Sequence, residues 1–130
     1  MKRIALIFAL ILIITGNGYA SDSAFEKADA NRDGSIDAKE FGSAVNNKFM
    51  QYDKNNDGVI DGKELNTAKD TDAAKEFKFM DKNRDGKVSK DEFNAAAFER
   101  FKLFDQSQDN TLSIPEYRTE RAYPILKFYF

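Results

Sequence analysis

Oxygen-bearing side chains recur at one fixed spacing in four twelve-residue segments, at residues 29–40, 53–64, 81–92 and 105–116. In each segment Asp stands at positions 1 and 5 and Glu at position 12, while position 3 is Asn or Ser. Carboxylate and amide oxygens are the ligands that hard cations such as Ca²⁺ prefer in proteins, and a backbone carbonyl at position 7 can add to them. The spacing therefore predicts four oxygen-lined cation sites.

The candidate ligands are the residues at positions 1, 3, 5, 7 and 12 of each segment, with position 9 added where it is acidic. They are Asp29, Asn31, Asp33, Ser35, Asp37 and Glu40 in the first segment, Asp53, Asn55, Asp57, Val59, Asp61 and Glu64 in the second, Asp81, Asn83, Asp85, Lys87 and Glu92 in the third, and Asp105, Ser107, Asp109, Thr111 and Glu116 in the fourth. Position 7 contributes its backbone carbonyl, so it needs no particular side chain. Polar turns alone do not explain four matches in register that each end in Glu.

Position 6 is where the fourth segment departs from the others. Gly34, Gly58 and Gly86 stand there in the first three segments, and glycine allows the left-handed backbone that wraps the chain around an ion. Asn110 replaces glycine in the fourth segment, and Ser107 is a poorer ligand than Asn. Asn is the next-best residue for a left-handed backbone. We therefore expect the fourth site to bind, but most weakly.

The four segments resemble the calcium loops of the EF-hand family. With their flanking helices they cover nearly all of the chain after residue 20. The resemblance implies an all-α fold, a compact helical domain with four calcium loops and short β-bridges between paired loops. It also implies up to four bound Ca²⁺ ions, with Mg²⁺ or a lanthanide as alternatives.

The residues that follow each loop predict a helix that begins inside it. Asp37, Asp61, Ser89 and Ser113 are each followed three residues later by Glu, which is the capping-box signature of a helix start. Between the first two loops only residues 41–52 intervene, and apolar residues recur there at helical spacing. One shared helix over residues 38–52 is the simplest prediction, with an equivalent helix between the third and fourth loops.

A shared helix places its two loops at opposite ends, so they cannot pair with each other. The loops start at residues 29, 53, 81 and 105, in steps of 24, 28 and 24, and the longer middle segment contains a plausible helix break at residues 69–72. We therefore predict that loop 2 pairs with loop 3 and loop 1 with loop 4. The bridges would involve the apolar residues at position 8, which are Ile36, Ile60, Val88 and Leu112.

The last eight residues, 123–130, are apolar or aromatic except for Lys127. Pro124 is expected to end the last helix and to leave a short segment of strand-like composition. This segment either folds back over the core, because exposed apolar patches are unfavourable, or docks on a partner or a membrane surface.

Residues 1–20 have the three-part layout of a secretory signal peptide. Lys2 and Arg3 precede eleven apolar residues, and the small residues Gly18 and Ala20 precede a cleavage point at Ser21. Eleven apolar residues are too few for a membrane anchor. The sequence thus predicts a cleaved signal, a single domain over residues 21–130, and a periplasmic or extracellular location.

Composition excludes several functions. The chain has no cysteine or histidine, so thiol chemistry, zinc fingers and imidazole bases are ruled out. A net charge of −2 gives no basic field for nucleic acid. No carboxylate pair stands apart from the candidate ligands, so we do not expect an enzyme.

The compressed loop spacing is also similar to that of lanmodulin, an exported bacterial lanthanide-binding protein. Lanmodulin loops carry proline at position 2 and more carboxylates than these loops, where position 2 is Ala30, Lys54, Lys82 or Gln106. Three or four carboxylates per loop suit a divalent ion better than a trivalent one. We therefore predict an exported protein that acts as a calcium buffer or sensor and whose folding is coupled to metal binding. An unidentified protein partner of the calcium-loaded state is a further possibility. A calcium-stapled structural or adhesion module and a lanthanide-binding protein are the alternatives.

Overall fold

The computed structural model describes residues 22–119 and 122–130, so the predicted signal peptide lies outside the described residues. Its helices are α1 (Asp22–Ala28), α2 (Ala38–Tyr52), α3 (Thr71–Met80), α4 (Lys90–Phe104), α5 (Ile114–Tyr117) and α6 (Tyr123–Leu126). Its strands are β1 (Ser35–Asp37), β2 (Val59–Asp61), β3 (Lys87–Ser89) and β4 (Thr111–Ser113). None of the described helices combines the length and the apolar character needed to cross a membrane.

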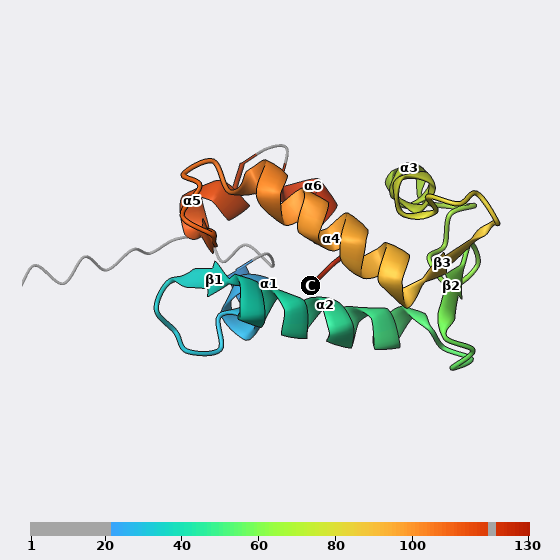
Figure 1. The fold of residues 1–130 in the computed structure, drawn as a ribbon, viewed down its shortest axis with the longest axis horizontal. Helices are drawn as coiled ribbons and strands as arrows, with labels where there is room; N and C mark the ends of the chain where they lie inside the picture. Colours follow the sequence, from blue (N-terminus) through green and yellow to red (C-terminus); the bar gives the residue numbers. More distant parts are fainter. Residues whose placement is uncertain (1–21, 120–121) are drawn as a thin grey trace, which may run out of the picture.

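Two helices of equal length, α2 and α4, lie side by side and form the frame of the molecule (Figure 1). Each has 15 residues and begins at a capping box, formed by Asp37 with Glu40 in α2 and by Ser89 with Glu92 in α4. Aromatic side chains fill the contact between them, with the ring centroids of Phe41 and Phe101 4.9 Å apart. The single shared helix predicted over residues 38–52 is confirmed.

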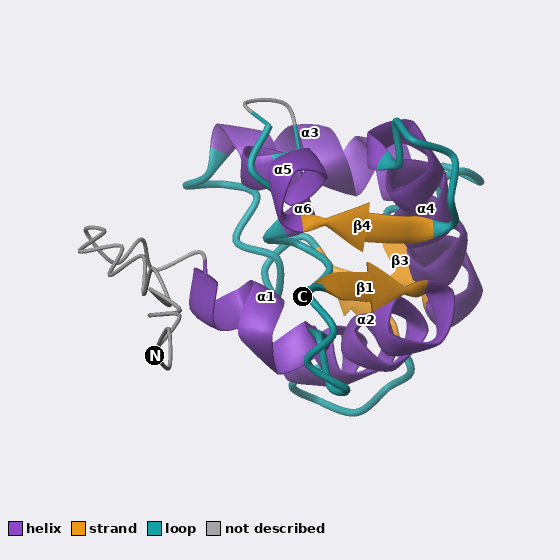
Figure 2. Cartoon of the chain, turned by 90° about the vertical axis from the view of Figure 1, so that its left-hand side faces the viewer, coloured by secondary structure: helices purple, strands orange, loops and turns teal. Residues whose placement is uncertain are grey.

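Short antiparallel strand pairs close the two ends of this frame. At one end Ile36 of β1 lies opposite Leu112 of β4, and at the other Ile60 of β2 lies opposite Val88 of β3. All four side chains are fully buried, so each strand pair contributes to the core. Figure 2 shows β1 and β4 next to each other at their end of the molecule. The predicted pairing of loop 1 with loop 4 and of loop 2 with loop 3 is confirmed.

The prediction of a helix after the second loop is wrong. Residues 62–69 form consecutive turns, and the amide of Thr67 donates to the carbonyl of Gly62 over 2.9 Å. Asn66 adopts a left-handed φ of 62°, which stops a right-handed helix after a single turn. Asp70 then caps α3 through bonds to the amides of Asp72 and Ala73, so the predicted break and new helix start at residues 69–72 are confirmed.

The C-terminal residues also differ from the prediction. Pro124 lies in the first turn of α6 rather than at the end of a helix, because that position requires no amide donor. The residues that follow form a helical turn and not a strand. Leu126, Phe128 and Tyr129 are nevertheless buried, as expected for a segment that folds back over the core.

Candidate metal centres

All four predicted loops share one backbone path. The residues at positions 4 and 6 of each loop have positive φ, the left-handed conformation that turns the chain back on itself. The φ angles are 60° at Arg32 and 87° at Gly34, 56° at Asn56 and 84° at Gly58, 61° at Arg84 and 83° at Gly86, and 58° at Gln108 and 65° at Asn110. Asn110 thus adopts the conformation that glycine supplies in the other loops.

The aspartate at position 1 organises the first half of each loop. In loop 1 the two carboxylate oxygens of Asp29 accept from the amides of Asp33, at 3.1 Å, and Gly34, at 3.0 Å. The same pair of bonds recurs in the other three loops, and in loop 4 the second donor is the amide of Asn110, at 2.9 Å. These bonds hold the carboxylate at position 1 over the concave side of the loop.

The side chains at positions 3 and 5 extend this pattern. The amide oxygen of Asn31 accepts from the backbone amide of Asp33 over 2.8 Å, and Asp33 in turn accepts from the amide of Ser35 over 3.0 Å. Loops 2 and 3 repeat both bonds. In loop 4 Ser107 instead donates its hydroxyl to Asp105 over 3.2 Å, so its oxygen is positioned differently from that of Asn.

The glutamate at position 12 closes each loop. In loop 1 one carboxylate oxygen of Glu40 accepts from the amide of Asn31 at 3.0 Å, and the other accepts from the amide of Asp37 at 3.1 Å. Glu64, Glu92 and Glu116 make the corresponding bonds to positions 3 and 9 of their own loops. The turn that leaves each loop, which is helical except after loop 2, therefore brings the glutamate back to the start of the loop.

The acidic residues at position 9 have a second role that the capping signature predicted. Asp37 accepts from the amide of Glu40 over 2.7 Å, and Asp61 accepts from the amides of Lys63 and Glu64. Both carboxylates therefore fix the outgoing turn in addition to being candidate ligands. At position 7 the hydroxyls of Ser35 and Thr111 donate to the aspartate at position 5 of their own loops. The side chains of Val59 and Lys87 at the same position do not take part in this hydrogen-bond pattern.

The donor set of each loop fits a hard divalent cation. Asp29, Asp53 and Asp105 at position 1 are buried, as are Glu40 and Glu116 at position 12. Lys75 pairs with Asp72, Lys82 with Glu99 and Arg100 with Glu76, and none of these three acids is a candidate ligand. Buried carboxylates that accept hydrogen bonds from amides and hydroxyls but have no cationic partner among these ion pairs are well suited to a bound cation.

Carboxylates alone do not form these sites. Across the described residues, no three acidic side chains converge closely enough to hold an ion by themselves, because each glutamate faces the amides of its own loop. The remaining donors are the amide oxygens at position 3 and the carbonyls at position 7. This mixed set of oxygens matches the set that the spacing predicts.

A family model described as EF hand matches residues 22–45, 47–68 and 74–97, which together make up more than half of the chain. The chain belongs to the EF-hand family. The matches cover the first three loops with their flanking segments, and EF-hands are typically calcium-binding domains without enzymatic activity. No curated protein matches the chain.

The fourth predicted loop, residues 105–116, lies outside these matches but repeats the hydrogen-bond geometry of the three matched loops. Its position-1 and position-12 bonds are present, and β4 pairs with β1 of the first EF-hand. Its differences from the other loops are the Asn at position 6, the Ser at position 3 and the short outgoing helix α5, which has four residues.

Hydrogen bonds keep several carboxylates of the predicted loops ionised. Burial acts to raise the pKa of Glu116, but bonds from Ser113 and Ser107 outweigh it and lower the pKa to about 2. The backbone amide of Ser89 lowers the pKa of Glu92, and the hydroxyl of Thr111 lowers that of Asp109. These carboxylates therefore carry their negative charge over the whole physiological pH range.

Ser89 and Ser113 are the functional residues that ligand spacing alone misses. Their hydroxyls bond to the position-12 carboxylates, at 3.0 Å for Glu92 and 2.7 Å for Glu116, so they orient these glutamates. The signal that identifies them is the capping box, which places Ser three residues before Glu.

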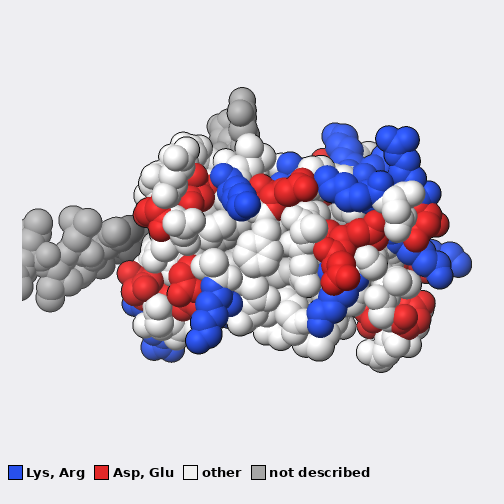
Figure 3. Space-filling view, in the orientation of Figure 1, with Lys and Arg blue, Asp and Glu red and all other residues white. Residues whose placement is uncertain are grey.

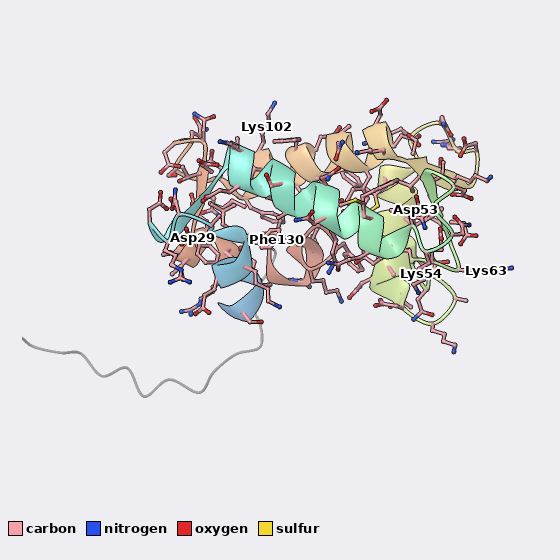
Figure 4. All side chains as sticks on the ribbon, turned by 90° about the horizontal axis from the view of Figure 1, so that it is seen from below. Asp29, Asp53, Lys54, Lys63, Lys102 and Phe130 are labelled. Atoms are coloured by element: carbon pink, nitrogen blue, oxygen red, sulfur yellow. The ribbon has the colours of Figure 1, made fainter. Side chains whose placement is uncertain are left out.

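The EF-hand loops lie at two separate ends of the molecule. Figure 4 labels Asp29 of loop 1 and Asp53 of loop 2 at opposite ends of α2. Figure 3 shows acidic side chains towards both ends and an uncharged area over the middle of that face. The arrangement gives two paired centres, loops 1 and 4 and loops 2 and 3, joined by a common core.

Proposed function

We propose that the chain is an exported calcium-binding protein that binds up to four ions in its EF-hand loops. The observation that carries this proposal is the repetition of one hydrogen-bond pattern in all four loops, the unmatched fourth included. The ligands are the candidate residues named from the sequence. Export rests on the signal-peptide layout of residues 1–20.

Calcium is the ion that the donor set favours. Loops 1 and 2 each offer four carboxylates and loops 3 and 4 each offer three, together with neutral amide, hydroxyl or carbonyl oxygens. This number suits a divalent cation, and the flexible geometry of Ca²⁺ tolerates the different side chains at positions 3 and 9. A bound cation would neutralise the buried acids at positions 1 and 12.

Metal binding and folding are coupled in this proposal. Without an ion, each loop carries three or four like charges within twelve residues, and α1 and α5 have only seven and four residues. Because each strand pair contributes a fully buried residue from either loop, a disordered loop also removes part of the core. The metal-free chain is therefore partly unfolded.

The test is a chelator-buffered titration of residues 21–130 with calcium and then with lanthanum, followed by far-UV circular dichroism. Ordering at micromolar calcium with little preference for lanthanum supports a calcium buffer or sensor. Ordering at millimolar calcium only, with a far tighter response to lanthanum, shows a lanthanide-binding protein instead. The proposal is contradicted if neither the helicity nor the melting temperature changes when chelator or ions are added.

A matched pair of variants assigns the ions to loops. Glu40→Gln and Glu116→Gln each remove one position-12 carboxylate from the loop 1 and loop 4 centre. Glu99→Gln removes an exposed acid on α4 whose ion-pair partner, Lys82, lies in loop 3, so it serves as the control for loops 1 and 4. Isothermal titration calorimetry is expected to show one site fewer, or one much weaker, for each loop variant and an unchanged number for Glu99→Gln.

A further inference from the structure

A buried ionic network connects the two helices of the third EF-hand. Glu76 of α3 is only 4% exposed, and both of its carboxylate oxygens accept from the guanidinium of Arg100 on α4 at 2.9 Å. The planar Arg side chain also lies over the ring of Phe79, 3.7 Å from its centroid. Glu76 is not a candidate ligand, so calcium binding does not account for this buried acid.

The network has a third member in the C-terminal segment, which we define as residues 122–130. The hydroxyl of Tyr129 donates to Glu76 over 2.5 Å, and Tyr129 is fully buried. Burial raises the pKa of this tyrosine, so it remains a hydrogen-bond donor at neutral pH. Glu76, Arg100 and Tyr129, here called the Glu76 network, therefore join α3, α4 and the end of the chain.

Aromatic side chains of the C-terminal segment cover the core between the two long helices. Phe130 packs against Phe41 of α2 and Tyr117 of α5, with centroids 5.7 and 5.4 Å away, and Tyr129 packs against Phe93 of α4 at 5.4 Å. Figure 1 shows the chain ending between α2 and α4. We call Phe41, Phe93 and Tyr117 the covered aromatic surface.

The attachment of this segment depends on its side chains. The backbone amides of residues 125–130 that form bonds donate to carbonyls of Ala122, Ile125 and Leu126, within the segment itself. No strand pairing is seen between the C-terminal segment and the rest of the described chain. A cavity of about 750 Å³ lies beside the segment and is lined in part by Glu76, Arg100 and Phe128.

We propose that the C-terminal segment is a built-in occupant of the covered aromatic surface, held there by the Glu76 network, so that calcium loading does not expose this surface to a partner. The network fixes α3 relative to α4, which are the incoming and outgoing helices of the third loop. A sensor EF-hand must change this relation in order to open. The proposal rests on the proposed calcium binding and selects buffering over sensing.

The experiment compares wild-type protein with Tyr129→Phe and with a matched control, Tyr52→Phe. Tyr129→Phe removes only the hydroxyl that reaches Glu76, whereas Tyr52→Phe removes a hydroxyl at the end of α2 that is not part of the Glu76 network and keeps the ring contact with Phe93. Two readouts are taken in saturating calcium: the rate at which carboxypeptidase releases Phe130, and binding of the fluorescent dye 1-anilinonaphthalene-8-sulfonate. Circular dichroism confirms that each variant is folded.

Wild type and Tyr52→Phe are expected to release Phe130 slowly and to bind little dye with calcium. Tyr129→Phe is expected to release it on the order of tenfold faster, because a bond to a buried carboxylate is lost, and to bind more dye. If Tyr129→Phe does not fold, Arg100→Lys replaces it, since Lys keeps the charge but cannot form the paired bonds. Either variant behaving like Tyr52→Phe overturns the proposal.

Calcium-induced dye binding by wild-type protein would also overturn it, because the covered aromatic surface would then open on loading. This outcome is distinct from failure of the proposed function. Absence of calcium binding appears in the dichroism titration, whereas the difference between Tyr129→Phe and Tyr52→Phe reports on the network in any folded state.

Discussion

The two paired centres have the same local chemistry but close very different lengths of chain. Loops 2 and 3 begin at residues 53 and 81, whereas loops 1 and 4 begin at residues 29 and 105. Closing the longer stretch costs about 0.9 kcal/mol more in chain entropy. The loop 1 and loop 4 centre also has the two shortest flanking helices, α1 and α5, apart from α6. Its stability therefore depends more strongly on tertiary contacts.

Each centre combines one loop that has four candidate carboxylate ligands with one loop that has three. Asp37 faces a loop with Ser113 at position 9, and Asp61 faces a loop with Ser89. The main electrostatic difference is across the strands, where Asp61 lies opposite Lys87 and Asp37 lies opposite Thr111. Besides Ser107 and Asn110 of loop 4, the centres thus differ in chain closure and in one cross-strand charge, and each difference can be tested.

Metal removal is expected to have the largest effect. Chelation should lower the melting temperature by at least about 10 °C, because several ions bind only the folded state. Hydrogen exchange should show that the amides of Ile36 and Leu112 lose protection before those of Ile60 and Val88. Simultaneous loss in both strand pairs would mean that chain closure does not separate the two centres.

Truncation of the buried C-terminal leucine comes next. Leu126→Ala should lower the free energy of unfolding by about 2–5 kcal/mol, because the side chain is fully buried and its removal leaves a cavity. Leu103→Ala is the control, since Leu103 is 59% exposed, and its effect should stay within about 0.5 kcal/mol. Chemical denaturation in saturating calcium measures both, and equal effects would show that the segment does not support the core.

Acidification should weaken the loop 1 and loop 4 centre through Glu116. Burial acts to raise its pKa, but the serine bonds lower the pKa from 4.5 to about 2, so the unfolded chain binds this proton more readily. The stabilisation is fully present above pH 4.5 and is lost as the pH falls towards 2. In Ser113→Ala one of the bonds that lower the pKa of Glu116 is absent. The contribution of Glu116 to the free energy of unfolding should therefore be smaller and should be lost at a higher pH. Melting curves at constant calcium from pH 7 to 2 test this, and identical profiles would contradict it.

Asn110→Gly is expected to strengthen the weakest loop. Glycine adopts the observed φ of 65° without the steric cost that Asn carries, so stability should rise by a few tenths to about 1 kcal/mol. Calcium affinity at loop 4 should rise as well. The reverse change, Gly58→Asn, should weaken loop 2 at a φ of 84°. Calorimetry of both variants measures the effect, and an unchanged fourth affinity would show that position 6 is not the limiting residue.

Lys87→Thr should have the smallest effect. It gives the loop 2 and loop 3 centre the residue that Thr111 supplies at the other end. Removing a positive charge near two cation sites should raise calcium affinity there by roughly two- to threefold at low ionic strength. The gain should disappear in 1 M salt, where exposed charges are screened. A gain that persists in high salt would point to a steric cause.

The sequence contains enough information to predict the positions of the loops, the shared helix and the pairing of the loops. These features follow from local patterns, because side-chain spacing defines the loops and the helix length fixes which loops can meet. The turn at residues 62–69 was missed because Asn66 in a left-handed conformation outweighs a correct capping box at Asp61. The helical turn after Pro124 was missed because proline favours a helix start as well as a helix end.

The contacts between distant residues could not be predicted from spacing. Glu76 and Arg100 are 24 positions apart and Glu76 and Tyr129 are 53 apart, and their partnership depends on how α3 and the C-terminal segment pack. The orientation of the position-12 glutamates towards the loop amides is likewise a property of the folded loop.

The equal lengths of α2 and α4 limit how this molecule can change by insertion or deletion. Each helix carries a position-12 glutamate in its first turn and leads directly into the position-1 aspartate of the next loop, Asp53 or Asp105. One added residue would rotate that next loop by about 100° around the helix axis and advance it by about 1.5 Å. The lengths of α2 and α4 therefore have to match each other. Only an equal change of whole helical turns in both helices would keep each of the four loops aligned with the loop it pairs with.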